Sequence, residues 1–179
     1  MVIGPNVKDV RVVGGGSSTL RPHYVATPLD SSASQYPDVE VETARGCFTH
    51  KYIPEAERHL LSPEQGANEK GLRYEFFSGG IDGEILNERV IPRGMVMLAA
   101  MAASPQDALR AQGYFKADES GTHTFGILAT GKSRIFVDDK LVADNWTNPV
   151  AGEAIFGMAS TEARGEVEMQ AGENYSVKI

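Results

Sequence analysis

The second part of the chain alternates apolar and polar residues in short segments, separated by turn residues roughly every ten positions. Glu166 and Glu168, for example, alternate with Val167 and Met169, which predicts a strand with one solvent-exposed and one buried face. The pattern predicts an antiparallel β-sandwich. Its expected strands are Leu72–Phe77, Ala111–Lys116, Thr122–Leu128, Ser133–Val137, Ala154–Met158, Gly165–Met169 and Tyr175–Ile179, with turns at Glu119–Gly121, Asp138–Lys140 and Gln170–Gly172.

The first part has a different pattern, in which short β-branched runs are bounded by glycine and proline. Val2–Ile3, Val10–Val13 and Val39–Thr43 are typical of buried strands in an α/β sheet, and Glu55–Leu61 of one or two helical turns. The predicted organisation is an incomplete α/β-sandwich segment (1–61), a linker rich in turn residues (62–70) and an antiparallel β-sandwich (71–179). The predicted fold class is therefore mainly β.

Charge and composition exclude several function classes. Seventeen basic and twenty-four acidic residues give a net charge of −7, without a basic cluster that could neutralise nucleic acid. The longest apolar run, Met95–Ala103, is about half of what a bilayer requires, so no membrane span is expected. Cys47 is the single cysteine; it cannot form an intrachain disulfide and is expected to be a small buried residue.

A glycine loop follows the second β-branched run. Val12–Ser17 superficially resembles a phosphate-binding loop, since dinucleotide-binding folds hold pyrophosphate between such a loop and a helix N-terminus. Thr19 stands where the third glycine should be, and Arg21-Pro22 leaves little room for the helix. A tight structural turn remains an alternative to a ligand-binding loop.

Two sets of motifs resemble one enzyme family. Val2–Asn6, Val13–Ser18 and Arg21–Leu29 resemble the opening of the second domain of fungal glycoside hydrolase family 3 β-glucosidases. The later motifs resemble the protective-antigen-type (PA-14) domain inserted in such enzymes: Gly71–Phe77, Gly113–Phe115, Ser120–Gly126 and Val137–Trp146. The resemblance implies a fragment of a retaining β-glucosidase that hydrolyses terminal non-reducing β-D-glucosyl residues. The insert would shape the aglycone side of the sugar pocket.

The resemblance also implies candidate substrate-binding residues. The glycine loop of the family approaches the sugar, which makes Gly15, Gly16 and Ser17 candidates. Trp146, the single tryptophan, is a fourth candidate because aromatic faces stack on sugar rings, although packing in the core or a loop is the alternative. Tyr74, Phe76 and Phe77 are expected in the core.

No catalytic residue is assigned within the chain. Retaining glycosidases need two carboxylates about 5 Å apart. In the family the nucleophile precedes this segment and the acid/base follows the insert, so the chain alone is expected to be inactive. No cofactor or metal is expected either: Lys132 lies in a loop where calcium-binding relatives carry aspartates, and Asp138-Asp139 is either a turn or, alternatively, a ligand pair.

Other functions remain open at this point. The sandwich could be a stand-alone, non-catalytic carbohydrate-binding module, or the chain could be a scaffold fragment left by a truncated gene. Expected partners are a β-glucoside or oligosaccharide and the remaining domains of the parent glycosidase, with neither nucleic acid nor membrane. Met1–Asn6 lacks the features of a signal peptide, and both ends look cut. Localisation stays open, with secretion favoured over the cytoplasm.

Overall fold

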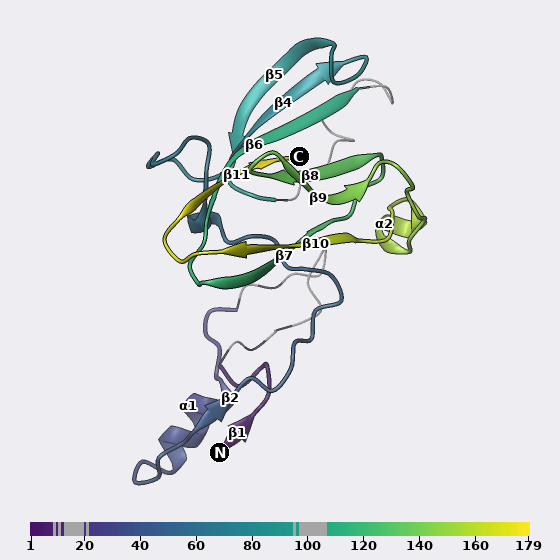
Figure 1. Cartoon of the computed structure of the whole chain (residues 1–179). Helices are drawn as coiled ribbons and strands as arrows, with labels where there is room; N and C mark the ends of the chain where they lie inside the picture. The colour runs from purple at the N-terminus through teal and green to yellow at the C-terminus, as the bar shows by residue number, and fades with distance from the viewer. Residues whose placement is uncertain (9, 11, 13–19, 21, 95, 97–106) are drawn as a thin grey trace. The chain divides into compact units, whose positions relative to one another are not determined.

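The computed structural model describes residues 1–8, 10, 12, 20, 22–94, 96 and 107–179. The chain divides into two compact units, Met1–Lys51 and Tyr52–Ile179, which are described separately below (Figure 1). Within the described ranges, no helix is long and apolar enough to cross a membrane.

The N-terminal unit contains a parallel strand pair and one helix. Strand β1 (Val2–Ile3) pairs with β2 (Thr43–Ala44), and the amide of Val2 donates to the Glu42 carbonyl over 2.8 Å. Helix α1 (Pro28–Gln35) begins at Thr27, whose hydroxyl accepts the Asp30 amide at 2.9 Å. A parallel pair connected through a helix is the arrangement expected of an α/β layer.

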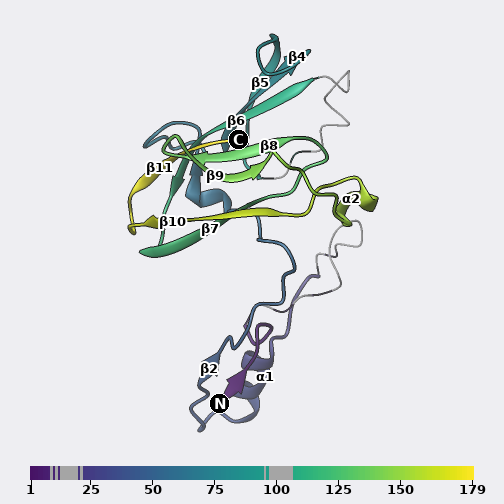
Figure 2. The same cartoon turned by 45° about the vertical axis from the view of Figure 1, so that its right-hand side comes forward.

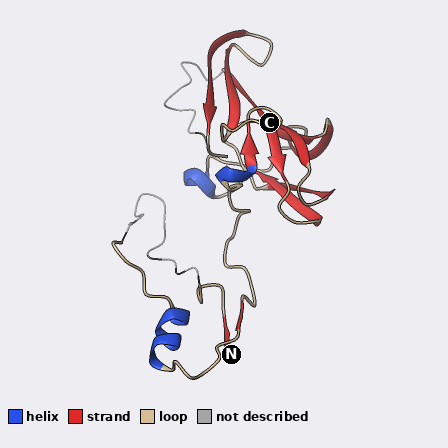
Figure 3. Ribbon diagram, turned by 90° about the vertical axis from the view of Figure 1, so that its left-hand side faces the viewer, coloured by secondary structure: helices blue, strands red, loops and turns tan. Residues whose placement is uncertain are grey.

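The second unit is built on one large antiparallel sheet, and strand dominates it (Figure 3). The strand order is β5-β4-β6-β11-β8-β9, and β3 also pairs with β6. The strands are β3 (Leu61–Ser62), β4 (Leu72–Ser78), β5 (Glu84–Ile91), β6 (Ala108–Lys116), β8 (Ser133–Val137), β9 (Lys140–Asn145) and β11 (Asn174–Lys178).

A second, two-stranded sheet completes the sandwich. Strands β7 (Gly121–Ile127) and β10 (Ala163–Met169) pair antiparallel and run beside β8 and β9 (Figures 1 and 2). The approach of β10 to β9 requires glycine, because a Cβ atom on Gly165 would lie 1.8 Å from the Val142 carbonyl oxygen. The two layers are thus held in direct backbone contact at this point.

The core lies between the two sheets. Phe115 on β6 meets Phe125 on β7 edge to face, with ring centroids 5.7 Å apart. Met169 at the end of β10 has no exposed surface. Tyr74 is buried and donates its hydroxyl to the Arg93 carbonyl at 2.7 Å, and this burial, with the nearby negative charge of Glu55, raises the pKa of Tyr74 to about 12. The expected core positions Tyr74, Phe76 and Phe77 are all buried.

The domain division falls earlier than the predicted boundary at residue 61. A 3₁₀ helix, η2 (Arg58–Leu60), leads into β3, which pairs with β6, and Pro63 in the predicted linker is buried. Residues 52–63 therefore belong to the sandwich unit, because β6 is long enough to hold both β3 and β4 along one edge.

Several elements differ from the sequence prediction. The predicted strand Ala154–Met158 is wrong, since this segment is a short turn, α2 (Ala154–Gly157), with left-handed backbone. Of Val39–Thr43, only Thr43 is in a strand, and α1, β3, β5 and β9 were not predicted. Val10–Val13 lies partly outside the described residues. Cys47 is exposed rather than buried.

Candidate functional site

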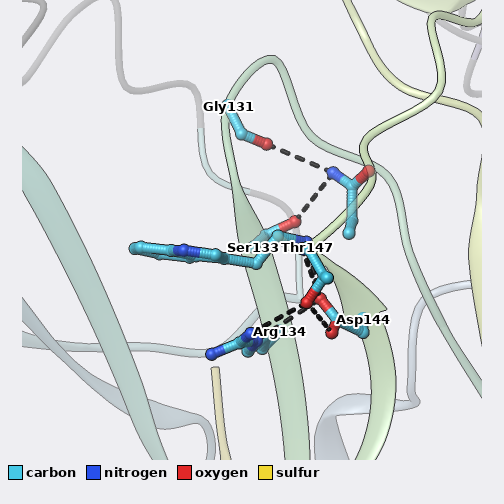
Figure 4. A network of polar contacts seen from close by, with 7 residues as sticks. Gly131, Ser133, Arg134, Asp144 and Thr147 are labelled. Carbon is cyan, nitrogen blue, oxygen red and sulfur yellow. Dashed lines mark hydrogen bonds and ion pairs between the residues drawn. The ribbon is translucent and has the colours of Figure 1, made fainter.

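The polar network at the end of the β8–β9 hairpin centres on Asp144 (Figure 4). Its Oδ1 accepts the backbone amides of Trp146 and Thr147 at 2.7 and 3.0 Å and the Arg134 Nε at 3.3 Å. Its Oδ2 accepts the Thr147 hydroxyl at 2.6 Å. The carboxylate thus shapes the turn that follows β9 and fixes the backbone on which Trp146 stands.

These contacts also fix the charge of Asp144. Hydrogen bonds from the Thr147 hydroxyl, then from the amides of Thr147 and Trp146, hold the pKa of the Asp144 carboxyl well below its usual range. The Arg134 guanidinium acts in the same direction. A carboxyl group in this state is ionised near neutral pH and has no proton to donate, so Asp144 suits a structural role better than that of a general acid.

Asn145 stabilises the same end of the hairpin with a buried side chain. It is only 3% exposed, and its side-chain amide donates to the Gly131 carbonyl at 3.2 Å and to the Ser133 hydroxyl at 3.1 Å. The loop between β7 and β8 is thereby attached to β9 (Figure 4).

Trp146 projects into solvent beside this network. It is 44% exposed, which favours the surface over the core alternative. The Arg134 Cζ lies 5.5 Å and the Lys132 Nζ 5.9 Å from the centre of the indole ring, within cation–π range. The indole is therefore an accessible aromatic surface flanked by two positive charges.

The connection from β9 to β10, residues 146–162, is called the tip loop here. Its base is closed by a bridge between Ala151 and Ser160 and by hydrogen bonds from Gly152 to Ala159 and from Thr161 to Val150, both 2.8 Å. The buried Ser160 donates its amide to the Ala129 carbonyl and accepts the Ala129 amide on its hydroxyl. The base is consequently well anchored.

The outer part of the tip loop is apolar and exposed. Phe156 is 99% exposed, and Ile155 and Met158 are also exposed. Ile155 and Phe156 adopt φ values of 51° and 58°, in the left-handed region that a β-branched residue rarely enters. Such strain costs of order 1–3 kcal/mol per residue and gathers at functional sites. The tip loop thus combines strain, apolar exposure and a rigid base.

Comparison with known proteins relates the chain to one enzyme family. The PA14 domain family matches residues 101–179. "Probable beta-glucosidase I" of Emericella nidulans is 33% identical over 98% of the chain, and that of Aspergillus fumigatus is 31% identical over its whole length. The chain spans about a fifth of these relatives, 21% and 22%.

Solved β-glucosidases share the fold. One from Kluyveromyces marxianus superposes on 99% of the chain with a TM-score of 0.75 and 24% identity, and the chain covers 22% of it. A second structure of that enzyme, in complex with glucose, gives a TM-score of 0.73 and 25% identity, and the chain covers 23% of it. The chain is thus similar over nearly its whole length to a segment of fungal β-glucosidases, and residues 101–179 of its sandwich match the PA14 domain family. The fungal resemblance inferred from the sequence motifs is confirmed.

The predicted site residues have different outcomes. Gly15, Gly16 and Ser17 lie outside the described residues, and their role stays a prediction. Trp146 is placed on the surface of the PA14 domain, but substrate binding by it is untested. Sequence reasoning did not single out Arg134, Asp144 or the tip loop.

Asp138 and Asp139 form the turn between β8 and β9. Both have positive φ, 46° and 61°, as the two-residue hairpin turn of this kind requires. The Asp138 carboxylate accepts the Ser176 amide at 2.8 Å and the Ser176 hydroxyl at 3.0 Å. Of the two alternatives for this pair in the PA14 domain, the turn is the one observed. Within the described part of the chain, no cluster of three His, Cys, Asp or Glu residues could hold a metal.

Proposed function

We propose that the chain is a non-catalytic segment of a retaining β-glucosidase, and that the tip loop of its PA14 domain forms part of the aglycone side of the sugar pocket. The exposed, strained apolar end of the tip loop carries this proposal. An almost fully exposed phenylalanine on left-handed backbone costs free energy and gives an isolated domain no contact in return. In a loop that completes a site in a larger protein, the same side chain can make the contacts that compensate for this cost.

The remaining domains of a parent glycosidase are the proposed partner of the tip loop. The chain covers 21–23% of its β-glucosidase relatives, which leaves most of such an enzyme outside it. The Kluyveromyces marxianus relative was solved with glucose, which supports a β-glucoside as the substrate class. Retaining hydrolysis uses two carboxylates about 5 Å apart, and by family resemblance both lie outside this segment.

The chemistry of the tip loop suits the aglycone rather than the reacting sugar. Phe156, Ile155 and Met158 offer apolar surface and no acid or base, so they can exclude water and pack against the leaving group. The closed base would hold this surface in place without rearrangement on binding.

A graft tests the proposal. Residues 1–179 replace the matching segment of the Emericella nidulans β-glucosidase, and KM and kcat are measured with a disaccharide. Phe156→Ala is expected to raise KM about fivefold to tenfold, since roughly 1–1.4 kcal/mol of apolar contact is lost, and to change kcat little. Ile85→Ala, at an exposed β5 position of the same sandwich, is the matched control. Unchanged KM in Phe156→Ala would contradict the proposal.

The isolated chain is expected to lack β-glucosidase activity, because double displacement requires both carboxylates. Release of nitrophenol from an aryl β-glucoside, followed against heat-treated protein, measures this. Turnover above that background would show that a catalytic pair exists within the 179 residues.

A second candidate function is glycan binding by the sandwich alone, and the exposure of Trp146 favours it. Because Trp146 is the single tryptophan, its fluorescence reports directly on a sugar stacked against it. A saturable fluorescence change on titration with a gluco-oligosaccharide would support this module function. In calorimetry, the corresponding binding heat should be absent in Trp146→Phe. No heat and no fluorescence change would leave the tip loop as the better candidate.

A further inference from the structure

Glu162 is a nearly buried carboxylate that none of the preceding roles uses. It ends the tip loop immediately before β10, and its side chain is 7% exposed. A charged group in such a position needs strong partners, because desolvation penalises an unpaired carboxylate. Its partners therefore indicate what it holds together.

The partners of Glu162 come from two other parts of the sandwich unit. Oε1 accepts the backbone amide of Ile53 at 2.8 Å, across 109 residues of sequence. Oε2 binds Arg164 through its Nε at 2.6 Å and its terminal NH2 nitrogen at 2.5 Å. Such charge-assisted contacts are about twice as strong as neutral hydrogen bonds.

The space for this contact is provided by β7. A Cβ atom on Gly126 would lie 2.9 Å from both the Glu162 Oε1 and the Ile53 Cδ1. Gly126 faces Arg164 in the β7–β10 register. The lead-in segment at Ile53, the strand β7 and the end of the tip loop thus meet at one carboxylate.

The position of Ile53 in the chain gives this contact its significance. The sandwich unit begins at Tyr52, so Ile53 is its second residue, directly after the N-terminal unit ends at Lys51. The hydrogen bond from Ile53 to Glu162 therefore ties the first residues of the sandwich unit to the end of the tip loop.

We propose that Glu162 is a positioning residue: it locks the lead-in segment at Ile53 to the base of the tip loop, and thereby holds the base of the tip loop in place within the sandwich. This rests on the proposed function of the tip loop. Glu162 itself contacts neither substrate nor the reacting atoms. Its loss frees the lead-in segment while the core around Met169 stays packed.

Amide hydrogen exchange in the 179-residue chain tests the lock itself. The ratio of the Ile53 exchange rate to that of the buried core residue Val177 is expected to rise at least about tenfold in Glu162→Ala. Glu162→Gln keeps a carbonyl acceptor for Ile53 and should give a smaller rise. Glu166→Ala, at an exposed glutamate of the following strand β10, should leave the ratio unchanged. A constant ratio in Glu162→Ala overturns the proposal, because a purely structural role would accelerate both amides together.

Kinetics of the grafted β-glucosidase test the consequence. Glu162→Ala is expected to raise KM for a disaccharide about threefold or more with little change in kcat, and Glu162→Gln to restore most of the affinity. An unchanged KM in Glu162→Ala, alongside a raised KM in Phe156→Ala, overturns the positioning role. If neither variant changes KM, the proposed function fails, and the Ile53 exchange ratio alone decides whether the lock exists.

Discussion

The N-terminal unit and the sandwich differ in how much of their hydrophobic surface they cover. In the sandwich, residues from seven strands and both sheets form one continuous buried core, which includes Tyr74, Phe115 and Met169. In the N-terminal unit, Val7 is the buried hydrophobic residue among those the structure describes, and α1 buries none. The difference teaches that β-branched runs form a stable layer only where other elements cover them.

Core truncation gives the largest expected contrast. Met169→Ala should lower the free energy of unfolding of the sandwich by about 2–5 kcal/mol, because a fully buried side chain leaves a cavity. Val7→Ala, the counterpart in the N-terminal unit, should leave the sandwich transition unchanged. Urea denaturation followed by tryptophan fluorescence measures both. Equal shifts would mean that the two units unfold as one.

Removing a polar anchor from each unit sharpens the comparison further. Asn145→Ala should destabilise the sandwich by about 1–2 kcal/mol, since Gly131 and Ser133 lose their donor. Thr27→Ala removes the cap of α1, worth about 1 kcal/mol locally, and should lower helix content by circular dichroism without moving the sandwich transition. A shift of that transition in Thr27→Ala would argue for coupling between the units.

A turn substitution should produce the smallest effect, and in the stabilising direction. Asp139→Gly relieves a non-glycine residue at φ 61° and should add about 0.5–1 kcal/mol to the stability of the sandwich. The ion pair that it removes, to Lys178, is exposed and contributes little. Thermal denaturation measures the effect. Asp138→Gly is the control: it loses both hydrogen bonds from Ser176 and should not raise the midpoint temperature of denaturation.

Much of the sandwich could be predicted from the sequence because the residues along its strands alternate between a solvent-exposed and a buried face. Ser133–Val137 was predicted with its observed bounds, helped by the turn at Asp138 and Asp139. β5 was missed because Ile85 and Leu86 are both exposed on an edge strand, which breaks the alternation. Helix α1 did carry a signal, Thr27 before Pro28, typical of a helix start.

The candidate site was harder to predict. The Arg134–Asp144 pair depends on the β8–β9 register, which shifts between Ile135 and Phe136. Counting back from the two-residue turn therefore places Arg134 opposite Ala143 rather than Asp144. At Ala154–Met158 the apolar residues indicated a strand, whereas the left-handed backbone of Ile155 and Phe156 has no signature in local composition. The partners of Glu162 arise from tertiary contacts far apart in sequence.

The central claim is that the PA14 sandwich is a self-sufficient unit, while the N-terminal unit, which buries little hydrophobic surface of its own, is not. Hydrogen exchange of the 179-residue chain compares the β1 region, through the amides of Val2 and Gly4, with the core strands, through Ala111 and Val177. The account predicts that Val2 and Gly4 exchange at least about a hundredfold faster. Equal protection of the two groups would mean one cooperative core and would contradict it.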